Sequence, residues 1–271
     1  MLDRLAAHGY GVTLEETEAA GHAEHLAAAA DPARVDLVVA AGGDGTINEV
    51  INGLATVPLP LAIAPLGTAN VLAAEIGLAT DPGAVAATIA WGEARPIALG
   101  LANGRRFVMM AGAGFDAHVV REVSVPLKRW LGKGAYVAAS LHQLFVYPFP
   151  SYRVRVDGAE WRAASVIVAN GRFYAGRHVA APGADLARPG LEVCLFERRG
   201  RLATIGYGLA LLAGRLPQLA SYRIIGGARR VEIAGRPGEP VQGDGDLMTE
   251  IDVAIEVLPD ALRLVFPPGP P

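Results

Sequence analysis

The sequence predicts two parts, an α/β domain of the doubly wound kind followed by a domain of antiparallel β-strands. Between residues 36 and 76 a strand, a glycine-containing turn and a helix follow one another twice. After residue 96 short strand-like runs alternate with Asn-Gly and Asp-Gly turns, which is typical of consecutive hairpins. The 271 residues are enough for two domains of ordinary size.

Composition excludes several classes of protein. Apolar residues make up 52% and charged residues 19%, so a large core is feasible and global disorder is excluded. A net charge of −3 argues against nucleic acid as the main partner. The single cysteine, Cys194, has no partner for an internal disulfide and is expected to be a buried thiol. No apolar run approaches the roughly 18 residues of a membrane span, and no signal peptide is evident, so we expect a cytoplasmic protein.

The amino-terminal residues predict three short elements. Met1–His8 has the pattern of a helix end that Gly9 closes, and Tyr10–Leu14 that of a short strand. Glu18–Ala30 is rich in alanine, which favours a helix, and Asp31-Pro32 stops it.

The first strand–turn–helix unit has the composition of an anion site. The apolar run Asp36–Ala41 predicts a strand, and the glycine turn Gly42–Gly45 follows it. Thr46 and Glu49 form a capping box, so we expect the next helix to start at Thr46. Backbone N–H groups and the positive end of a helix would meet there, and glycines let a phosphate approach closely. Asp44 in such a loop is unfavourable unless it holds a cation or water; the alternative is a tight turn without a ligand.

The second unit repeats this design. Leu61–Ala64 predicts a strand, Pro65–Asn70 a turn, and Val71–Ile76 a helix. The segments Gly45–Asn48 and Gly67–Asn70 share the pattern Gly-Thr-x-Asn. Adjacent parallel strands present such loops at one carboxyl edge, where open α/β sheets bind ligands.

The following residues predict a helix, a hinge and then β-structure. Pro82–Trp91 is the helix, and Glu93–Pro96 is expected to be the hinge out of the first domain. Leu127–Val146 and Leu202–Leu216 are the helices expected within the second domain. Its strand-like runs are residues 97–102, 106–110, 154–156, 163–169, 191–197, 222–225, 230–233, 253–257 and 263–266.

Two nucleotide-binding signatures were tested against the sequence. Gly112–Ala117 fits the dinucleotide pattern G-x-G-x-x-A, but the strand before it belongs to a hairpin and does not open a βαβ unit. A Walker A motif is absent, so a phosphate would have to be held by the glycine loops.

Gly42–Thr46, together with the Pro-Leu-Gly-Thr-x-Asn run Pro65–Asn70, resembles the diacylglycerol kinase catalytic domain of bacterial soluble lipid kinases. That family includes sphingosine and ceramide kinases and is related to NAD kinases. The resemblance implies an NAD-kinase-like nucleotide domain, a second antiparallel β-sandwich domain, and an active site between them. It implies residues 1–95 with about 259–271 for the first domain and 96–258 for the second. It also implies transfer of the γ-phosphate of ATP, with Mg²⁺, to the hydroxyl of diacylglycerol or a similar lipid alcohol.

The resemblance assigns roles to individual residues. In Gln242–Leu247 the family has Asp-Gly-Glu, so Asp244 is the expected general base, with Asp246 supporting or replacing it; the alternative is a simple turn. Asp44 and Asp116 are the expected metal-site carboxylates, although Asp116 equally fits a helix cap. The residues expected to bind the nucleotide are Thr17, Gly42, Gly43, Asp44, Gly45, Thr46, Ile47, Asn48, Glu49, Gly67, Thr68 and Asn70.

The acceptor is expected to come from a membrane surface. Ala135–Phe149 is apolar, and the basic residues shortly before it are Arg121, Lys128, Arg129 and Lys133. An apolar helix beside a basic edge suits peripheral contact with an anionic membrane. The alternative is a core helix with solvated charges.

Two other functions stay open at this point. An NAD-kinase-like enzyme would phosphorylate a ribose hydroxyl, but Asn70-Val71 stands where an Asn-Asp pair is expected for reading a dinucleotide. A non-catalytic nucleotide-binding protein is the third reading.

The resemblance also places a strand and an Asn-Pro-x-Ser-Gly loop before the first residue of this chain. Tyr10–Leu14 would then be the second strand of the sheet, and its edge and that of Asp36–Ala41 would lie unpaired. Unpaired edges invite pairing with another chain, so we expect a tendency to form a homodimer and a gain in stability and ATP affinity from an upstream extension.

Overall fold

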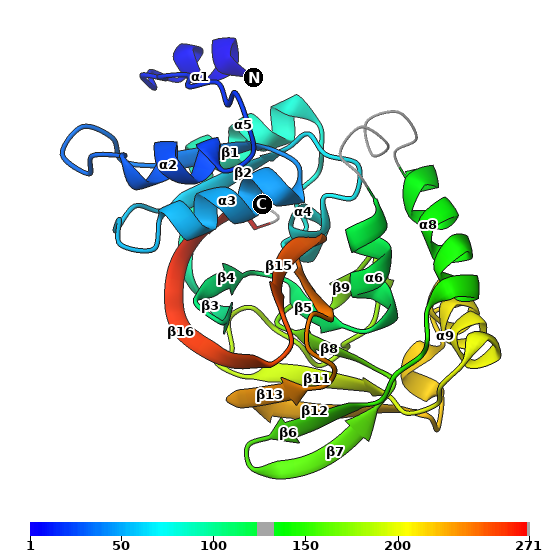
Figure 1. The fold of residues 1–271 in the computed structure, drawn as a ribbon. Coiled ribbons are helices and arrows are strands. Elements are labelled where there is room, and N and C mark those ends of the chain that lie inside the picture. Colours follow the sequence, from blue (N-terminus) through cyan, green and yellow to red (C-terminus); the bar gives the residue numbers. More distant parts are fainter. Residues whose placement is uncertain (124–132, 270–271) are drawn as a thin grey trace.

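The computed structural model describes residues 1–123 and 133–269, which form an α/β part resting on a β-sandwich (Figure 1). The helices are α1 Leu2–Ala7, α2 His22–Ala28, α3 Asp44–Gly53, α4 Val71–Glu75, α5 Pro82–Trp91, α6 Phe115–Glu122, α8 Lys133–Val146, α9 Arg201–Leu212 and the 3₁₀ turn η1 Leu216–Gln218. The strands are β1 Val38–Gly42, β2 Leu61–Pro65, β3 Glu93–Ala102, β4 Arg105–Phe107, β5 Met110–Ala113, β6 Tyr152–Val156, β7 Ala159–Ala163, β8 Ser165–Ala169, β9 Phe173–Tyr174, β10 His178–Val179, β11 Leu191–Phe196, β12 Tyr222–Ala228, β13 Arg230–Ala234, β14 Pro240–Gly243, β15 Asp246–Glu250 and β16 Val253–Phe266.

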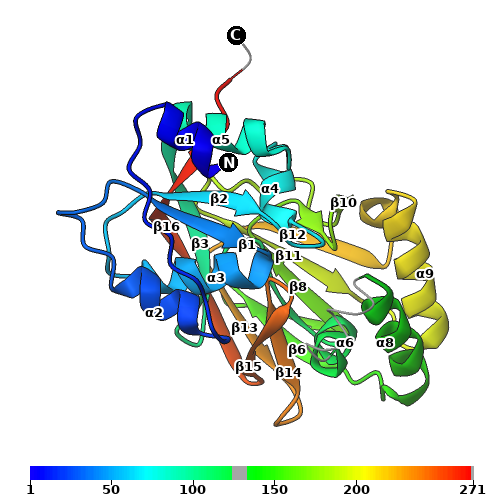
Figure 2. The same cartoon turned by 90° about the horizontal axis from the view of Figure 1, so that it is seen from above.

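The α/β part is built around the parallel pair β1 and β2. Both strands end at the same edge, because Gly42 is the register partner of Pro65. Helices α2 and α3 lie on one side of the pair and α1 and α5 on the other (Figure 2). Strand β2 is buried along its whole length, as its uninterrupted apolar sequence requires. The two glycine loops therefore leave this layer at one place.

Strand β16 joins the two parts of the molecule. It runs for 14 residues from the sandwich to the α/β layer (Figure 1). It pairs antiparallel with β13 and with the full length of β3, and Leu264 pairs parallel with Leu61 of β2. The prediction that the last strand-like run returns to the α/β part is confirmed. Glu93–Pro96 is not a hinge: the main chain there is the start of β3, held by its ladder to β16.

The sandwich packs two sheets face to face. Strands β13, β6 and β7 extend the first sheet, and the second sheet has the order β12-β11-β8-β5-β14-β15. Tyr152, Val154 and Val231 meet Val166 and Val193 in a buried core between them. The predicted turns Asn103-Gly104 and Asp157-Gly158 both have positive φ at both residues and close antiparallel pairs. The run 163–169 was expected to pair across the Asp157-Gly158 turn, but its residues 165–169 are strand β8 of the other sheet. Strand β7, which ends at Ala163, completes the hairpin.

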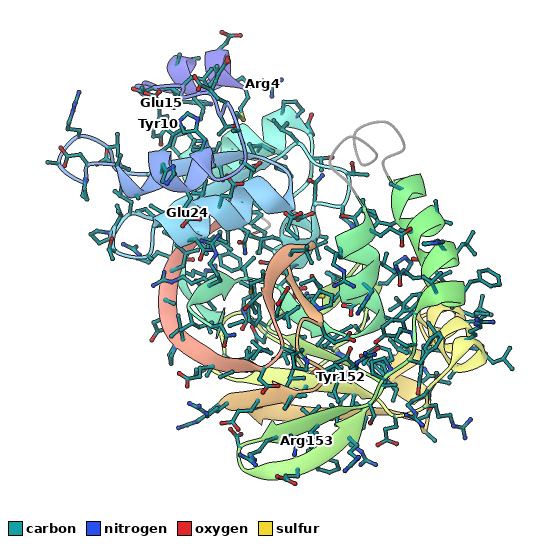
Figure 3. The ribbon with its side chains drawn as sticks, viewed as in Figure 1. Arg4, Tyr10, Glu15, Glu24, Tyr152 and Arg153 are labelled. Atoms are coloured by element: carbon teal, nitrogen blue, oxygen red, sulfur yellow. The ribbon has the colours of Figure 1, made fainter. Side chains whose placement is uncertain are left out.

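The structure corrects the prediction for the amino-terminal residues. Tyr10–Leu14 forms no strand and lies exposed in the segment between α1 and α2, where Figure 3 labels Tyr10 and Glu15. A strand needs a backbone partner. Among the described residues, β1 pairs with β2, and no strand pairs with Tyr10–Leu14. Tyr10 is fixed by its side chain instead, since its hydroxyl donates to the Ala90 carbonyl at 2.8 Å.

Helix boundaries differ from the prediction for identifiable reasons. Helix α2 begins at His22, later than expected, because Gly21 in a left-handed conformation precedes it. Helix α3 begins at Asp44 and not at Thr46, and its Gly43 cap residue carries no side-chain cap. The capping-box prediction is therefore wrong. Of the expected helix over residues 127–146, the structure describes α8; Lys128 and Arg129 lie outside the described residues.

The predicted buried cysteine is confirmed. Cys194 lies fully buried in β11, and burial raises the pKa of its thiol to about 12. Helix α5 has the predicted bounds, and Asp81 caps it by accepting the N–H groups of Gly83 and Ala84.

Candidate active site

The two glycine loops touch each other at their glycines. A β-carbon built on Gly67 would lie 2.5 Å from the Gly43 α-carbon, and one on Gly43 would lie 3.3 Å from that of Gly67. The Leu66 N–H donates to the Gly42 carbonyl at 2.8 Å and ties the loops together. No side chain fits between the two loops, so glycine at both positions allows the two backbones to approach each other closely.

Side chains of both loops fix this arrangement. Asp44 Oδ1 accepts the N–H of Val71, the first residue of α4, at 2.8 Å, and so crosses from the first loop to the second. Asn70, at a φ of 48°, accepts the Gly67 N–H at 2.9 Å and donates to the Gly67 carbonyl at 2.8 Å. The two loops that carry the Gly-Thr-x-Asn pattern are therefore held together as one structural unit.

The late carboxylates come to the same place. Strands β14 and β15 form a hairpin whose turn has positive φ at Asp244 and Gly245. From this turn Asp246 reaches the first loop, where its Oδ2 occupies the space that a side chain on Gly45 would need. The structure therefore joins residues about 200 positions apart in the sequence, as the resemblance implied.

The Asp244 carboxylate accepts more hydrogen bonds than a general base with an available oxygen would. Its Oδ2 accepts from Asn48 Nδ2 and the Val108 N–H, both at 2.8 Å. Its Oδ1 accepts from the Met109 and Met110 N–H groups at 2.9 and 3.0 Å. Burial raises the pKa of this carboxyl, and the four hydrogen bonds act in the opposite direction. Since a carboxylate offers about four lone-pair positions, Asp244 can take up a proton only by giving up one of these bonds.

Asn48 anchors the Asp244 turn to α3. Besides Asp244, its side-chain N–H₂ donates to the Arg106 carbonyl at 3.1 Å. One turn later Asn52 donates to the same carbonyl at 3.1 Å and accepts the Arg106 N–H at 2.9 Å. The sequence reasoning missed Asn52; its spacing of four from Asn48 on a predicted helix was the available signal.

Asp116 lies on the far side of the same turn. Gln242 Nε2 donates to its Oδ2 at 3.1 Å, and Gln242 Oε1 accepts the Gly245 N–H at 3.0 Å. Burial raises the pKa of Asp116 to about 6, and its Oδ1 is buried without a hydrogen-bond partner in the described chain. Its side chain makes no helix cap, which corrects that alternative. The sequence alone had indicated no role for Gln242.

The fingerprint in this segment is not a dinucleotide site. Strand β5 lies antiparallel between β8 and β14, whereas a Rossmann turn follows a strand of a parallel βαβ unit.

Four other residues predicted to bind the nucleotide differ in their surroundings. Ile47 is buried in the core, and Glu49 accepts the Gly21 and Ala23 N–H groups at 2.8 and 3.2 Å, so it caps α2. Thr17 lies exposed between α1 and α2, and Thr68 lies exposed on the second loop.

Within residues 1–123 and 133–269, no three His, Cys, Asp or Glu side chains gather as a ready metal cage. Mg²⁺ is ordinarily held by one or two carboxylates together with substrate phosphates. Asp116 has a buried oxygen without a hydrogen-bond partner in the described residues, and Asp44 is a carboxylate of the first glycine loop.

Comparison with known proteins agrees with this geometry. Residues 1–102 match the diacylglycerol kinase catalytic domain, and residues 109–266 match the YegS C-terminal NAD kinase beta sandwich-like domain. The chain is 32% identical to a probable lipid kinase YegS-like of Pseudomonas putida, over 97% of this chain and 88% of that protein. It is 31% identical to a diacylglycerol kinase of Mycobacterium tuberculosis, over 90% of this chain and 81% of that protein.

The fold has a close counterpart among solved structures. A crystal structure of a diacylglycerol kinase from Bacillus anthracis superposes with a TM-score of 0.76 at 22% identity, over 99% of this chain and 90% of that one. The predicted fold class, an NAD-kinase-like α/β part with an antiparallel β-sandwich, is confirmed. With both domain models matched in order and relatives aligned over nearly the whole chain, this protein belongs to the family of YegS-like lipid kinases and diacylglycerol kinases.

Proposed function

We propose that this protein transfers the γ-phosphate of ATP to the hydroxyl of diacylglycerol or a similar long-chain lipid alcohol. The observation that carries the proposal is the meeting of the Asp246 carboxylate with Gly45 of a double glycine loop. Phosphoryl transfer depends mainly on alignment and charge stabilisation, and this junction combines a place for phosphates with a carboxylate beside it.

The glycine loops would hold the nucleotide phosphates. Close backbone approach at Gly43 and Gly67 leaves no side chains to repel an anion, and α3 starts at this point with its positive end. Asp44 and Asp116 would hold Mg²⁺, which when bound neutralises charge on the transferring phosphate. Asp44 also keeps the two loops in register through the Val71 N–H.

We assign the general base to Asp246 and a positioning role to Asp244. In the reaction the lipid oxygen forms a bond to the γ-phosphorus, the bond from that phosphorus to the β–γ bridging oxygen breaks, and ADP leaves. Asp246 takes the alcohol proton. Asp244, with four hydrogen bonds already accepted, holds the turn that aims Asp246.

The lipid would arrive from a bilayer at the face made by α8 and α9, which lie side by side (Figure 2). Ala135 and Ala139 of α8 are buried, so one side of this helix is core, as the alternative reading held. The opposite side is also apolar. The exposed apolar side chains of the two helices are Val137, Leu141, Phe145, Val146, Leu202, Ile205, Leu209 and Leu212.

Charge at this α8–α9 face suits an anionic membrane surface. Neither helix contains an acidic residue, and the exposed Arg198, Arg199 and Arg215 flank α9. Arg201 joins the helices by donating to the Phe145 carbonyl at 2.9 Å. Arg121 is tied to α6 by its hydrogen bond to His118 Nδ1 at 2.9 Å. In the described residues no helix has both the length and the apolar character to cross a bilayer, so the contact we propose is peripheral.

ATP turnover with three acceptors tests the proposal. ADP release is measured with phosphatidylcholine–phosphatidylglycerol vesicles that contain diacylglycerol, with the same vesicles without it, and with NAD in solution. Turnover that requires diacylglycerol supports the lipid kinase. Turnover with NAD alone would instead support the dinucleotide kinase, and no turnover with any acceptor would leave a nucleotide-binding relative.

A further inference from the structure

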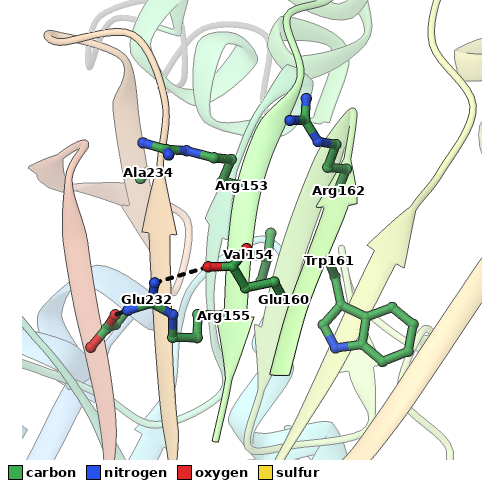
Figure 4. Close-up of a pocket in the computed structure, with 8 residues that line it drawn as sticks. All are labelled: Arg153, Val154, Arg155, Glu160, Trp161, Arg162, Glu232 and Ala234. Carbon is green, nitrogen blue, oxygen red and sulfur yellow. Dashed lines mark hydrogen bonds and ion pairs between the residues drawn. The ribbon is translucent and has the colours of Figure 1, made fainter. Parts of the chain in front are cut away.

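A second positively charged site lies on the outer face of the sandwich, away from the glycine loops. Strands β13, β6 and β7 form the floor of a shallow hollow of about 430 Å³. Figure 4 shows its lining, and Figure 3 places Arg153 at the end of the molecule opposite the α/β part.

Strand register sorts the side chains of this hollow into two rows. In one row Glu232 is the partner of Arg155, and Arg155 is the partner of Glu160. Arg155 bonds both carboxylates, at 3.1 and 2.9 Å, so this row sets one guanidinium between two carboxylates. In the other row Ala234 is the partner of Arg153, and Arg153 is the partner of Arg162.

The second row places two positive charges directly opposite each other. Cross-strand partners have β-carbons roughly 5 Å apart, and like charges in that position repel. Neither Arg153 nor Arg162 forms an ion pair with the described part of the chain, and in Figure 4 no dashed contact reaches either guanidinium. Both arginines interact electrostatically with the Glu160 carboxylate, but that carboxylate already accepts a hydrogen bond from Arg155. In Figure 4 the Arg153 side chain extends toward Ala234.

We infer that Arg153 and Arg162 bind a phosphate group. Two guanidinium groups on neighbouring strands offer planar, paired N–H donors that match phosphate oxygens, and a dianion bound by both would reduce their mutual repulsion. The phosphate belongs either to a phospholipid headgroup or to a small soluble phosphate. The site is separate from the junction at Gly43 and Gly67 and does not depend on the proposed kinase activity.

Binding is tested without ATP or turnover, in two arms, on the whole chain. Inorganic phosphate is titrated calorimetrically at constant ionic strength, and co-sedimentation is measured with phosphatidylcholine vesicles with and without phosphatidate. The variant is Arg153→Gln with Arg162→Gln. The control, Arg34→Gln with Arg188→Gln, removes the same charge elsewhere. Phosphate bound at the glycine loops is common to every variant and cancels in the comparison.

We expect the Arg153→Gln, Arg162→Gln variant to bind at least about fivefold more weakly in one arm, while the control matches the wild type. Loss in the vesicle arm identifies a lipid headgroup, and loss with inorganic phosphate identifies a soluble ligand. Glu160→Gln should strengthen binding in the same arm, because it removes the competing carboxylate and both arginines stay in place. Equal binding by wild type and double variant in both arms would overturn the inference, provided that their melting curves coincide.

Discussion

The contact between the two glycine loops makes Gly67→Ala the sharpest test of the candidate active site. The substitution adds one methyl group whose carbon would lie 2.5 Å from the Gly43 α-carbon and 2.9 Å from Asn70 Oδ1. Ordinary van der Waals separation begins near 3.4 Å, so the loops must part by about 1 Å. Gly67 does not have a positive φ, so the alanine backbone itself is unstrained and the effect is steric.

Displacement by about 1 Å in a phosphate-aligning loop is expected to lower kcat/KM by about 10²-fold. The cost to the fold should be only about 1–3 kcal/mol, the usual range for overpacking. Diacylglycerol phosphorylation and urea denaturation are measured on the same preparations. Gly11→Ala, in the exposed segment between α1 and α2, is the matched control, because a β-carbon there meets nothing within 4 Å. Activity of Gly67→Ala within about threefold of Gly11→Ala would refute the reasoning that this contact aligns the reaction.

The other predictions concern charges in and near the same site. Asp44→Asn should lower turnover by about 10²-fold or more, yet melt like the wild type, because an amide oxygen can still accept the Val71 N–H; more than about a tenth of the activity remaining would contradict the role. Asp246→Asn should lower kcat by about 10²–10⁴-fold. Asp244→Asn should destabilise the fold by roughly 1–3 kcal/mol in urea, because its amide would point N–H groups at backbone N–H donors. A larger loss of kcat in Asp244→Asn than in Asp246→Asn would return the base to Asp244. Burial raises the pKa of Asp116 to about 6, so the folded state binds its proton more tightly than the unfolded state. Relative to Asp116→Asn, the wild type should therefore lose about 3 kcal/mol of unfolding free energy as pH rises from about 4 to above 6, and a pH-independent difference would exclude the shift. Phe145→Glu with Leu209→Glu should cut vesicle binding and activity on bilayer diacylglycerol about tenfold or more, but leave activity on a short-chain soluble analogue unchanged. Val12→Glu, in the exposed segment between α1 and α2, should change neither vesicle binding nor activity.

Local sequence determined the elements whose physics is local. Asn103-Gly104 and Asp157-Gly158 specify turns with positive φ by their local sequence, and the structure has both. Asp81 and Pro82 specify the start of α5 for the same reason. The repeated Gly-Thr-x-Asn pattern placed two loops at one sheet edge, because parallel neighbours must share that edge.

Other features were decided by partners distant in the sequence. Tyr10–Leu14 has strand-like residues but lies outside any ladder, since β-structure exists only where another backbone is available. Glu49 fits a capping box for its own helix, yet it caps α2, because the Gly21 and Ala23 N–H groups lie within its reach. The sequence places Asp244 and Asp246 in one short segment and ranks Asp244 first as the general base. Only the tertiary structure surrounds the first with four hydrogen-bond donors and turns the second toward Gly45, since hydrogen bonding and burial are set by what packs around a side chain.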